Sequence, residues 1–395
     1  MSTHILIAGA GIGGLGAALS LAQLGLKVTV FDQSDAFGEV GAGVQISPNA
    51  YKVLCDWGLG EALKKTANFP EKLQVRNTSS DKLLGQLTLG KTAQARYGFP
   101  FATIRRADLH ALLLNAVQQF DHVDLRLNAR ISSITEKNQQ VTVTTETGDS
   151  FTADALIGAD GLWSRVRQHV LGDAAPRATG HTAWRALLPM ANVPAELQQD
   201  KVTAWLAADS HTIAYPVQQG KSLNIVYCSE NRDKIGLKPA YLLPKVLSKV
   251  LQKTFQLASN SNAWTRWDLF DRPPLTSSAQ MFNPVHPSIA LLGDAAHPML
   301  PYLAQGAAMA LEDGRALAFS VRNSPENMAV ALQHYAQTRW QRNAKVQARA
   351  RRNGAIFHAK PPVSWARDAA MGLLGEKLLD IPWLYGHKPP VKSTF

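Results

Sequence analysis

The chain has 395 residues, of which 46% are hydrophobic and 18% are charged. These values are typical of a globular protein with one large core or two joined cores, and they exclude a disordered, collagen-like or low-complexity chain. The 41 Lys and Arg residues outnumber the 30 Asp and Glu residues, which gives a net charge of +11. Anionic substrates, nucleic acid and acidic lipid are all compatible with this excess, and composition does not choose among them.

Cysteine content and apolar runs bear on the compartment. Cys55 and Cys228 are the only cysteines, and neither lies in a CxxC pair. They provide no disulfide framework and no cysteine metal site, which favours a reducing cytoplasm. Residues 5–26 carry no charge, but six of them are glycine. We interpret this stretch as strand, glycine turn and helix, and we expect a cytoplasmic protein with no integral membrane segment.

The first elements in chain order form a β-α-β unit. Residues 4–8 and 27–31 are short apolar runs typical of buried parallel strands, and residues 15–24 favour a helix. Between the first strand and the helix, Gly9, Gly11 and Gly14 satisfy the pattern GxGxxG. Gly9 permits the tight turn, Gly11 lets a pyrophosphate approach the helix N-terminus, and Gly14 lets the helix pack on the strand.

Asp32 ends the second strand, 21 residues after Gly11. An acidic side chain at this place is positioned to accept a hydrogen bond from a ribose hydroxyl. The alternative is a glycine-rich turn with a solvated Asp, but strand, glycines, helix and acid all agree with one another. The sequence therefore predicts dinucleotide binding.

The rest of the chain indicates a second unit inserted into the first. Helical patterns run over residues 49–65 and 106–119, and buried strands are predicted at 154–159 and 288–293. Between the last two, short β-type runs alternate with Pro, Gly and Asn-Ser clusters. These runs cover residues 182–188, 202–206, 212–217, 223–228 and 263–269.

We therefore predict an α/β fold: a discontinuous Rossmann-like domain with an inserted, mainly β domain and a helical C-terminus. The first domain would take residues 1–70, 100–175 and 284–325. A substrate-binding sheet would take residues 71–99 and 176–283, and the C-terminal helical region residues 326–395.

Two further motifs follow the predicted buried strands. Asp160-Gly161 comes after the first, and Gly293-Asp294 comes after the second, with Gly306 opening a helix-like stretch. With GxGxxG at the start, this order and spacing resembles the class A FAD-dependent aromatic hydroxylases, the flavoprotein monooxygenases of the salicylate and hydroxybenzoate hydroxylase type. The resemblance runs over nearly the whole chain and includes residues 41–50, 106–109 and 383–386.

The resemblance implies a set of contacts to FAD. Asp294 would hydrogen-bond the ribityl chain, Asp32 would hold the adenosine ribose, and the helix beginning at Gly306 would face the flavin pyrimidine. Asp160 belongs to a motif tied to both FAD and NAD(P)H, although a strand-end Asp-Gly turn is the commoner interpretation of that dipeptide alone. The cofactor-binding residues are then Gly9, Gly11, Gly14, Asp32, Gln45, Arg106, Asp160, Gly293, Asp294, Gly306 and Ala307.

The sequence after Gly14 contains no second GxGxxG. The resemblance accordingly implies that NADH or NADPH binds transiently as reductant, with O2 as co-substrate. It also implies a C4a-hydroperoxyflavin that transfers oxygen to an electron-rich ring. The 11 histidines show no metal-ligand spacing, so no metal is expected.

His211 and Tyr215 are the candidates for phenol activation. They are four residues apart, so on one strand both side chains point to the same face. Simple packing is the alternative for each, but relatives use these positions on the phenol. His211 is the preferred general base because its ordinary pKa is close to working pH. Pro298 is expected over the reactive edge of the flavin, and Arg185 either pairs with a substrate carboxylate or is solvated on an edge strand.

No single specificity of the family is reproduced. Gln45 and Tyr302 stand where 6-hydroxynicotinate hydroxylases carry histidines, and Pro301 stands where some 3-hydroxybenzoate 6-hydroxylases carry glutamine. The predicted substrate is therefore a small phenolic, carboxylated, monocyclic aromatic, and the predicted enzyme is a monomer or homodimer.

Three other functions remain as alternatives. A quinone-biosynthesis hydroxylase at a membrane surface would need an apolar, lipid-facing C-terminus, and residues 371–374 are a weak candidate that we expect to be buried. A flavin-binding protein without hydroxylation is the second. Nucleic-acid binding rests on charge alone, and no binding motif supports it. Much of that charge recurs at helical spacing and is expected to form one solvated stripe: Arg339, Arg342, Lys345, Arg349 and Arg352.

Overall fold

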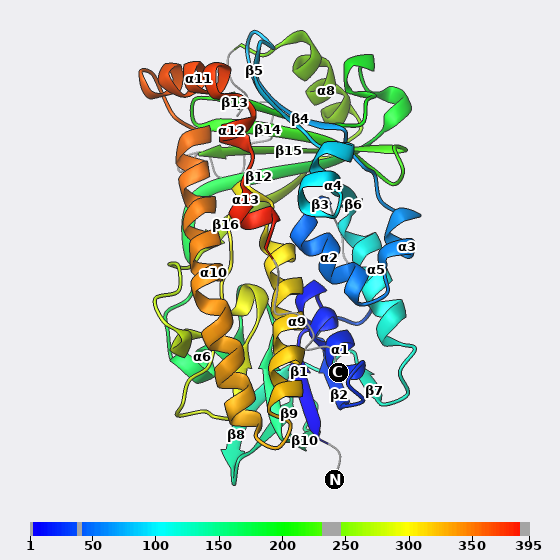
Figure 1. Cartoon of the computed structure of the whole chain (residues 1–395), viewed down its shortest axis with the longest axis vertical. Coiled ribbons are helices and arrows are strands. Elements are labelled where there is room, and N and C mark those ends of the chain that lie inside the picture. The colour runs from blue at the N-terminus through cyan, green and yellow to red at the C-terminus, as the bar shows by residue number, and fades with distance from the viewer. Residues whose placement is uncertain (1–2, 38–41, 231–245, 388–395) are drawn as a thin grey trace.

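The computed structural model describes residues 3–37, 42–230 and 246–387. The molecule is elongated, with a parallel sheet toward one end and a larger sheet toward the other (Figure 1). Two long helices, α9 (Gly306–Asn323) and α10 (Met328–Phe357), run along the molecule between these ends. Within the described residues, no helix is long and apolar enough to cross a bilayer.

The parallel sheet has five strands in the order β17-β11-β1-β2-β7. Its members are β1 (His4–Ala8), β2 (Lys27–Phe31), β7 (Val123–Arg126), β11 (Ala155–Gly158) and β17 (Ile289–Leu291). The central strands are short, apolar and buried, as expected for a sheet covered on both faces. Because β17 comes nearly 130 residues after β11, the expectation of a discontinuous α/β fold is confirmed.

The larger sheet has seven strands in the order β16-β12-β15-β14-β13-β4-β5. Five come from the expected insertion: β12 (Arg177–Pro189), β13 (Lys201–Ala207), β14 (Ser210–Val217), β15 (Ser222–Glu230) and β16 (Thr265–Asp271). The other two are β4 (Lys72–Asn77) and β5 (Leu83–Thr88), and β4 pairs in parallel with β13. Helix α8 (Lys249–Asn260) packs its apolar face, including Leu251 and Phe255, on this sheet.

The remaining elements connect and cover these sheets. Two small antiparallel sheets join β3 (Gly43–Ile46) to β6 (Ala102–Arg105), and β8 (Ile131–Lys137) to β9 (Gln140–Thr145) and β10 (Ser150–Ala153). The other helices are α1 (Ile12–Ala22), α2 (Pro48–Asp56), α3 (Gly60–Lys64), α4 (Gly90–Tyr97), α5 (Arg106–Val117), α6 (Arg165–Leu171), α11 (Val363–Leu374), α12 (Glu376–Leu379) and α13 (Pro382–Tyr385).

The expectation of a solvated basic stripe on α10 is wrong for part of the stripe. Arg339 is only 2% exposed, and its guanidinium binds the buried carboxylates of Glu312 and Asp313 on α9. Arg342 binds Glu312 as well, at 2.7 Å. Helical periodicity predicted correctly that these residues share one side of α10. Part of that side packs against α9, where two acidic side chains bind the arginines. Of the five basic residues, Lys345 and Arg352 are exposed.

Candidate active site

A cavity of about 710 Å³ lies at the carboxyl ends of β1 and β2. Gly9 has a φ of +97°, and a Cβ there would meet the carbonyl oxygen of Ala159 at 2.5 Å. Gly14 is equally constrained, because its Cβ would lie 1.8 Å from the Gly9 carbonyl oxygen. Gly11 differs: it is the N-cap of α1 and has no atom within 4 Å of the place a Cβ would take. The structure thus leaves open space at this helix N-terminus, where an anion is favoured.

Asp32 lines the same cavity from the end of β2. One carboxylate oxygen accepts a hydrogen bond of 2.8 Å from the backbone N–H of Ala10, and the other accepts one of 2.9 Å from Ser34. These bonds fix the carboxylate beside the glycine turn. Each oxygen retains a further lone pair that can accept a bond from a ribose hydroxyl.

Asp160 also lines this cavity, but its carboxylate is used by the protein itself. One oxygen accepts from the Ser164 hydroxyl at 2.5 Å, and the other accepts from the backbone N–H groups of Arg165 and Val166, at the start of α6. Burial raises the pKa of this carboxyl group above its ordinary value. The observed contacts of Asp160 therefore hold the turn between β11 and α6.

A second cavity, of about 230 Å³, lies where β3, β14 and the start of α9 meet. His211 and Tyr215 both line it, as expected from their spacing on one strand. Gln45, Asp294, Gly306 and Ala307 line it from the other elements. Arg106 lines this cavity and the 710 Å³ cavity alike.

The loop between β17 and α9 differs from expectation at one proline. Asp294 is exposed and lines the 230 Å³ cavity, and Gly293 has a φ of +61°. Pro298 is buried and lines neither cavity, and its carbonyl accepts a hydrogen bond from Gln347. Pro301, three residues further on, lines the 230 Å³ cavity.

Burial controls the protonation of the two residues on β14. Burial lowers the pKa of His211 well below its ordinary value, and the neighbouring His358 and His181 lower it further. Burial and these two rings disfavour the protonated imidazole, so the ring of His211 is held in its neutral form. Burial raises the pKa of Tyr215 well above 10, so its hydroxyl stays protonated and remains a hydrogen-bond donor.

Arg185 is an interior residue of the large sheet. It lies on β12, which pairs with β15 and β16, so the edge-strand alternative is wrong. Its guanidinium lies 5.2 Å from the centre of the Trp267 ring, and burial lowers its pKa. Among the residues that the structure describes, its Nε has no hydrogen-bond partner. A half-buried cation whose buried Nε is unpaired among the described residues favours an anionic ligand at the 230 Å³ cavity.

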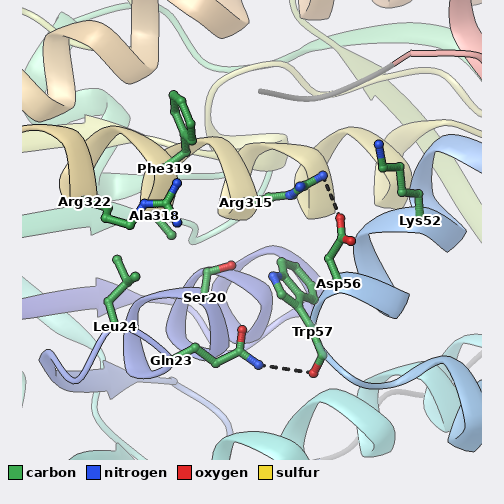
Figure 2. A pocket seen from close by; sticks show the side chains of 10 residues that line it. All are labelled: Ser20, Gln23, Leu24, Lys52, Asp56, Trp57, Arg315, Ala318, Phe319 and Arg322. Carbon is green, nitrogen blue, oxygen red and sulfur yellow. Dashed lines mark hydrogen bonds and ion pairs between the residues drawn. The ribbon is translucent and has the colours of Figure 1, made fainter. Parts of the chain in front are cut away.

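The structure has two other cavities, one apolar and one polar. An apolar one of about 430 Å³ lies between the large sheet and the C-terminal helices, and it shares Gln45, Ile213 and Pro301 with the 230 Å³ cavity. Figure 2 shows a polar pocket between α1, α2 and α9, where Arg315 binds Asp56 at 2.7 Å. No residue of that polar pocket lines either of the two cavities described first.

The sequence did not place His358 and Glu230 beside His211, and it identified Tyr302 only as a position where the family varies. His358 binds His211, Glu230 binds His358, and Tyr302 packs on both histidine rings. No spacing signal links them, because they come from β14, β15, the loop before α9 and the end of α10. His181, Glu230 and His358 are also close enough to share a cation, as are Glu136, His169 and His286.

The two cavities fit FAD. Open space at Gly11, the carboxylate of Asp32 and the N-terminus of an 18-residue helix at Gly306 are the features that a pyrophosphate, a ribose and a reduced flavin ring require. Arg106 links the two cavities, so one extended dinucleotide can occupy both.

Comparison with known proteins agrees with this geometry. The model of the FAD binding domain family matches residues 2–350. The chain is 38% identical to 3-hydroxybenzoate 6-hydroxylase 1 of Aquipseudomonas alcaligenes, over 98% of each chain. It is 34% identical to 3-hydroxybenzoate 6-hydroxylase of Polaromonas naphthalenivorans, over 97% of this chain and 95% of the relative.

Solved structures share the fold. A salicylate hydroxylase substrate complex aligns with a TM-score of 0.75 at 24% identity, over 99% of each chain. Klebsiella pneumoniae HpxO, complexed with FAD and uric acid, aligns with a TM-score of 0.84 at 24% identity, over 95% of this chain and 94% of that one. The chain belongs to the FAD binding domain family, and within it to the FAD-dependent aromatic hydroxylases.

Proposed function

We propose that the protein hydroxylates a small, monocyclic phenolic carboxylate, with 3-hydroxybenzoate as the first candidate. The observation that carries this proposal is the composition of one 230 Å³ cavity, which combines His211, Tyr215 and Arg185. A neutral imidazole, a protonated phenol and a half-buried guanidinium together suit a ligand with both a phenolic hydroxyl and a carboxylate. The curated relatives named 3-hydroxybenzoate 6-hydroxylase support the candidate substrate.

Each side chain then has a role. His211 accepts the phenolic proton, which makes the ring more nucleophilic. Tyr215 donates a hydrogen bond, and Arg185 pairs with the carboxylate. FAD, when bound, supplies electron transfer from NADH or NADPH and the activation of O2. The residues proposed to hold it are Gly9, Gly11, Gly14, Asp32, Gln45, Arg106, Asp160, Gly293, Asp294, Gly306 and Ala307.

The apolar surroundings serve the same reaction. Ile213, Val226, Met299 and Leu300 line the 230 Å³ cavity together with the polar residues. Such walls exclude water, which strengthens the electrostatic interactions inside and protects reactive species from hydrolysis. We further propose that the seven-stranded sheet is the substrate-binding unit, and that the enzyme acts in the cytoplasm as a monomer or homodimer.

The proposal is tested with purified protein and a panel of aromatic acids. We expect a yellow protein whose oxidation of NADH or NADPH is stimulated by 3-hydroxybenzoate. Hydroxylation at C6 converts 3-hydroxybenzoate into 2,5-dihydroxybenzoate, which chromatography separates from the 2,3- and 3,4-isomers. Bound flavin with no hydroxylated product from any acid of the panel would instead support a non-hydroxylating flavoprotein.

One observation favours a second candidate, a hydroxylase that works at a membrane surface. We expected residues 371–374 to be buried, and this is wrong for Leu373, which is 85% exposed on α11. Trp365 on the same helix is 69% exposed. Exposed apolar side chains on one helix suit contact with a lipid surface. Co-sedimentation with anionic vesicles, lost in the double variant Trp365→Ser, Leu373→Ser, would support this candidate.

A further inference from the structure

We propose that His211, His358 and Glu230 form a relay that carries the phenolic proton of the substrate from the cavity to the protein surface. The proposal rests on the proposed function, because it takes His211 as the base that deprotonates a phenol. It assigns roles to His358 and Glu230, which contact neither of the two cavities that fit FAD.

The relay is a continuous chain of short hydrogen bonds. Nδ1 of His211 lies 2.8 Å from Nε2 of His358, and Nδ1 of His358 lies 2.9 Å from a carboxylate oxygen of Glu230. His211 and His358 are both buried, with 2% and 4% of their surface exposed, whereas the Glu230 side chain is 39% exposed. The chain therefore begins at the cavity wall and ends in contact with solvent.

The order of the bonds fixes which nitrogen carries each proton. An ionised Glu230 can only accept, so Nδ1 of His358 is the donor and Nε2 of His358 is an acceptor. Nδ1 of His211 must then donate to that acceptor. The remaining nitrogen, Nε2 of His211, is left unprotonated, and it has no hydrogen-bond partner among the described residues. Glu230 thus sets the tautomer in which His211 can act as a base.

Proton transfer along this chain balances without any co-reactant. The phenolic O–H bond breaks as an N–H bond forms at Nε2 of His211. The Nδ1–H bond of His211 breaks as Nε2 of His358 gains a proton, and the Nδ1–H bond of His358 breaks as the Glu230 carboxylate gains one. Glu230 then releases the proton to water, and the phenolate keeps the electron pair and the negative charge.

The backbone holds the three relay residues in place. The backbone N–H of Asp209 donates to the carbonyl of His358, and the backbone N–H of Glu230 donates to the carbonyl of Asp209. The rings of Tyr302 and Phe357 pack against His211 at 5.3 and 5.4 Å between ring centres. Neither imidazole is therefore free to turn away from the chain.

Other charged and titratable groups surround the relay and tune its pKa values. Burial lowers the pKa of His358, and its bond to Glu230 opposes that shift. His181 lies 3.7 Å from Glu230 and also bonds the Tyr302 hydroxyl. The groups facing the relay are His181, Asp209, Cys228, Tyr302 and Lys360, the last of which pairs with Asp209. Because burial disfavours the charged form of both imidazoles, Nε2 of His211 is available to accept a proton.

The test measures deprotonation directly, without turnover. A hydroxybenzoate carrying a nitro group, whose phenolate absorbs at longer wavelength than the phenol, is mixed in a stopped-flow instrument with the oxidised holoenzyme. We expect phenolate formation to slow at least tenfold in His358→Gln, with a larger solvent isotope effect. Affinity for the nitrophenol and flavin content should stay within twofold of wild type. His122→Gln, an exposed histidine far from the cavity, is the matched control and should behave as wild type.

Two further variants separate the relay from a structural effect. Glu230→Gln keeps the shape but lacks the carboxylate that accepts the proton, so phenolate formation should slow. In His358→Ala, added imidazole should restore the rate. Phenolate formation at the wild-type rate in both His358→Gln and Glu230→Gln, with His211→Gln inactive, would overturn the relay and leave the proposed base intact. Normal deprotonation in His211→Gln would instead contradict the proposed function.

Discussion

The Nε of Arg339 on α10 lies 2.7 Å from a carboxylate oxygen of Asp313 on α9, and both side chains are almost completely buried. Asp313 also binds Nε2 of His297 at 2.5 Å and the backbone N–H of Gly293. The pair therefore ties the loop that carries Asp294 to two long helices. The position of one wall of the 230 Å³ cavity depends on this contact.

Arg339→Met should strongly destabilise the protein. The change leaves the buried carboxylates of Glu312 and Asp313 without their shared cation, and breaking such a buried pair costs about 3–5 kcal/mol. We expect the midpoint of urea unfolding to fall markedly. Arg352→Met, an exposed residue of the same helix, should change stability by no more than about 0.5 kcal/mol. Equal effects of the two changes would contradict a structural role for the buried network.

Glu312 should contribute to stability in a defined range of pH. Burial alone would raise its pKa, but Arg339 and Arg342 outweigh burial and lower the pKa to about 2. A folded-state pKa below the ordinary value of 4.5 gives stability that is present above pH 4.5 and is lost as pH falls toward 2. The contribution is on the order of 3 kcal/mol. We expect the unfolding midpoint of Glu312→Gln to depend less on pH in this range, whereas the exposed Glu326→Gln should follow wild type.

Two glycine substitutions in one turn should have different effects. Gly14→Ala places a Cβ 1.8 Å from a backbone oxygen, so the apoprotein itself should be destabilised. Gly11→Ala meets no protein atom within 4 Å, and the Gly11 φ of −71° suits alanine. The Gly11→Ala apoprotein should therefore unfold at the same temperature as the wild-type apoprotein. Its dissociation constant for FAD should rise at least tenfold, because the methyl group occupies the space proposed for the pyrophosphate. Calorimetry of the apoproteins and flavin titration measure the two effects. Unchanged FAD affinity in Gly11→Ala would place the pyrophosphate elsewhere.

Arg185→Met should weaken binding of the carboxylate. Loss of a charge-assisted hydrogen bond is worth about 1.5–3 kcal/mol, so we expect the KM for an aromatic acid to rise roughly 10- to 100-fold. Flavin content is measured alongside, because Arg185 lines the 230 Å³ cavity but not the cavity at Gly11, where the pyrophosphate and ribose are proposed to bind. A phenol that lacks the carboxylate serves as the control, and its KM should hardly move. A similar loss for both ligands would mean that Arg185 acts by packing on Trp267.

The sequence was informative where the signal is local. The turn from Gly9 to Gly14 is positioned by backbone geometry within a few residues, so its pattern could be interpreted from spacing. Spacing also put His211 and Tyr215 on one face of β14, whereas their selection for the site came from the resemblance to the family. The loop after β17 has no period from which to count, so spacing did not show that Pro301 lines the 230 Å³ cavity and Pro298 does not.

Contacts between distant segments were beyond the sequence. His211 and His358 are 147 positions apart and meet only because the end of α10 packs beside β14. Arg339 was expected in solvent because its own helix shows only a basic face. The acids that draw Arg339 inward, Glu312 and Asp313, lie on α9 and become its neighbours only when α9 and α10 pack.

The parallel pairing of β4 with β13 joins residues 72–77 to residues 201–206. The large sheet is therefore not a module that could be cut from the chain: residues 176–283 alone would leave β13 with a row of unsatisfied backbone donors and acceptors. Such an open edge invites pairing between molecules. Chimaeras between related hydroxylases should then fold only when β4 and β5 are exchanged together with the insertion. Two separate segments of the chain must therefore be transferred together to transfer the large sheet.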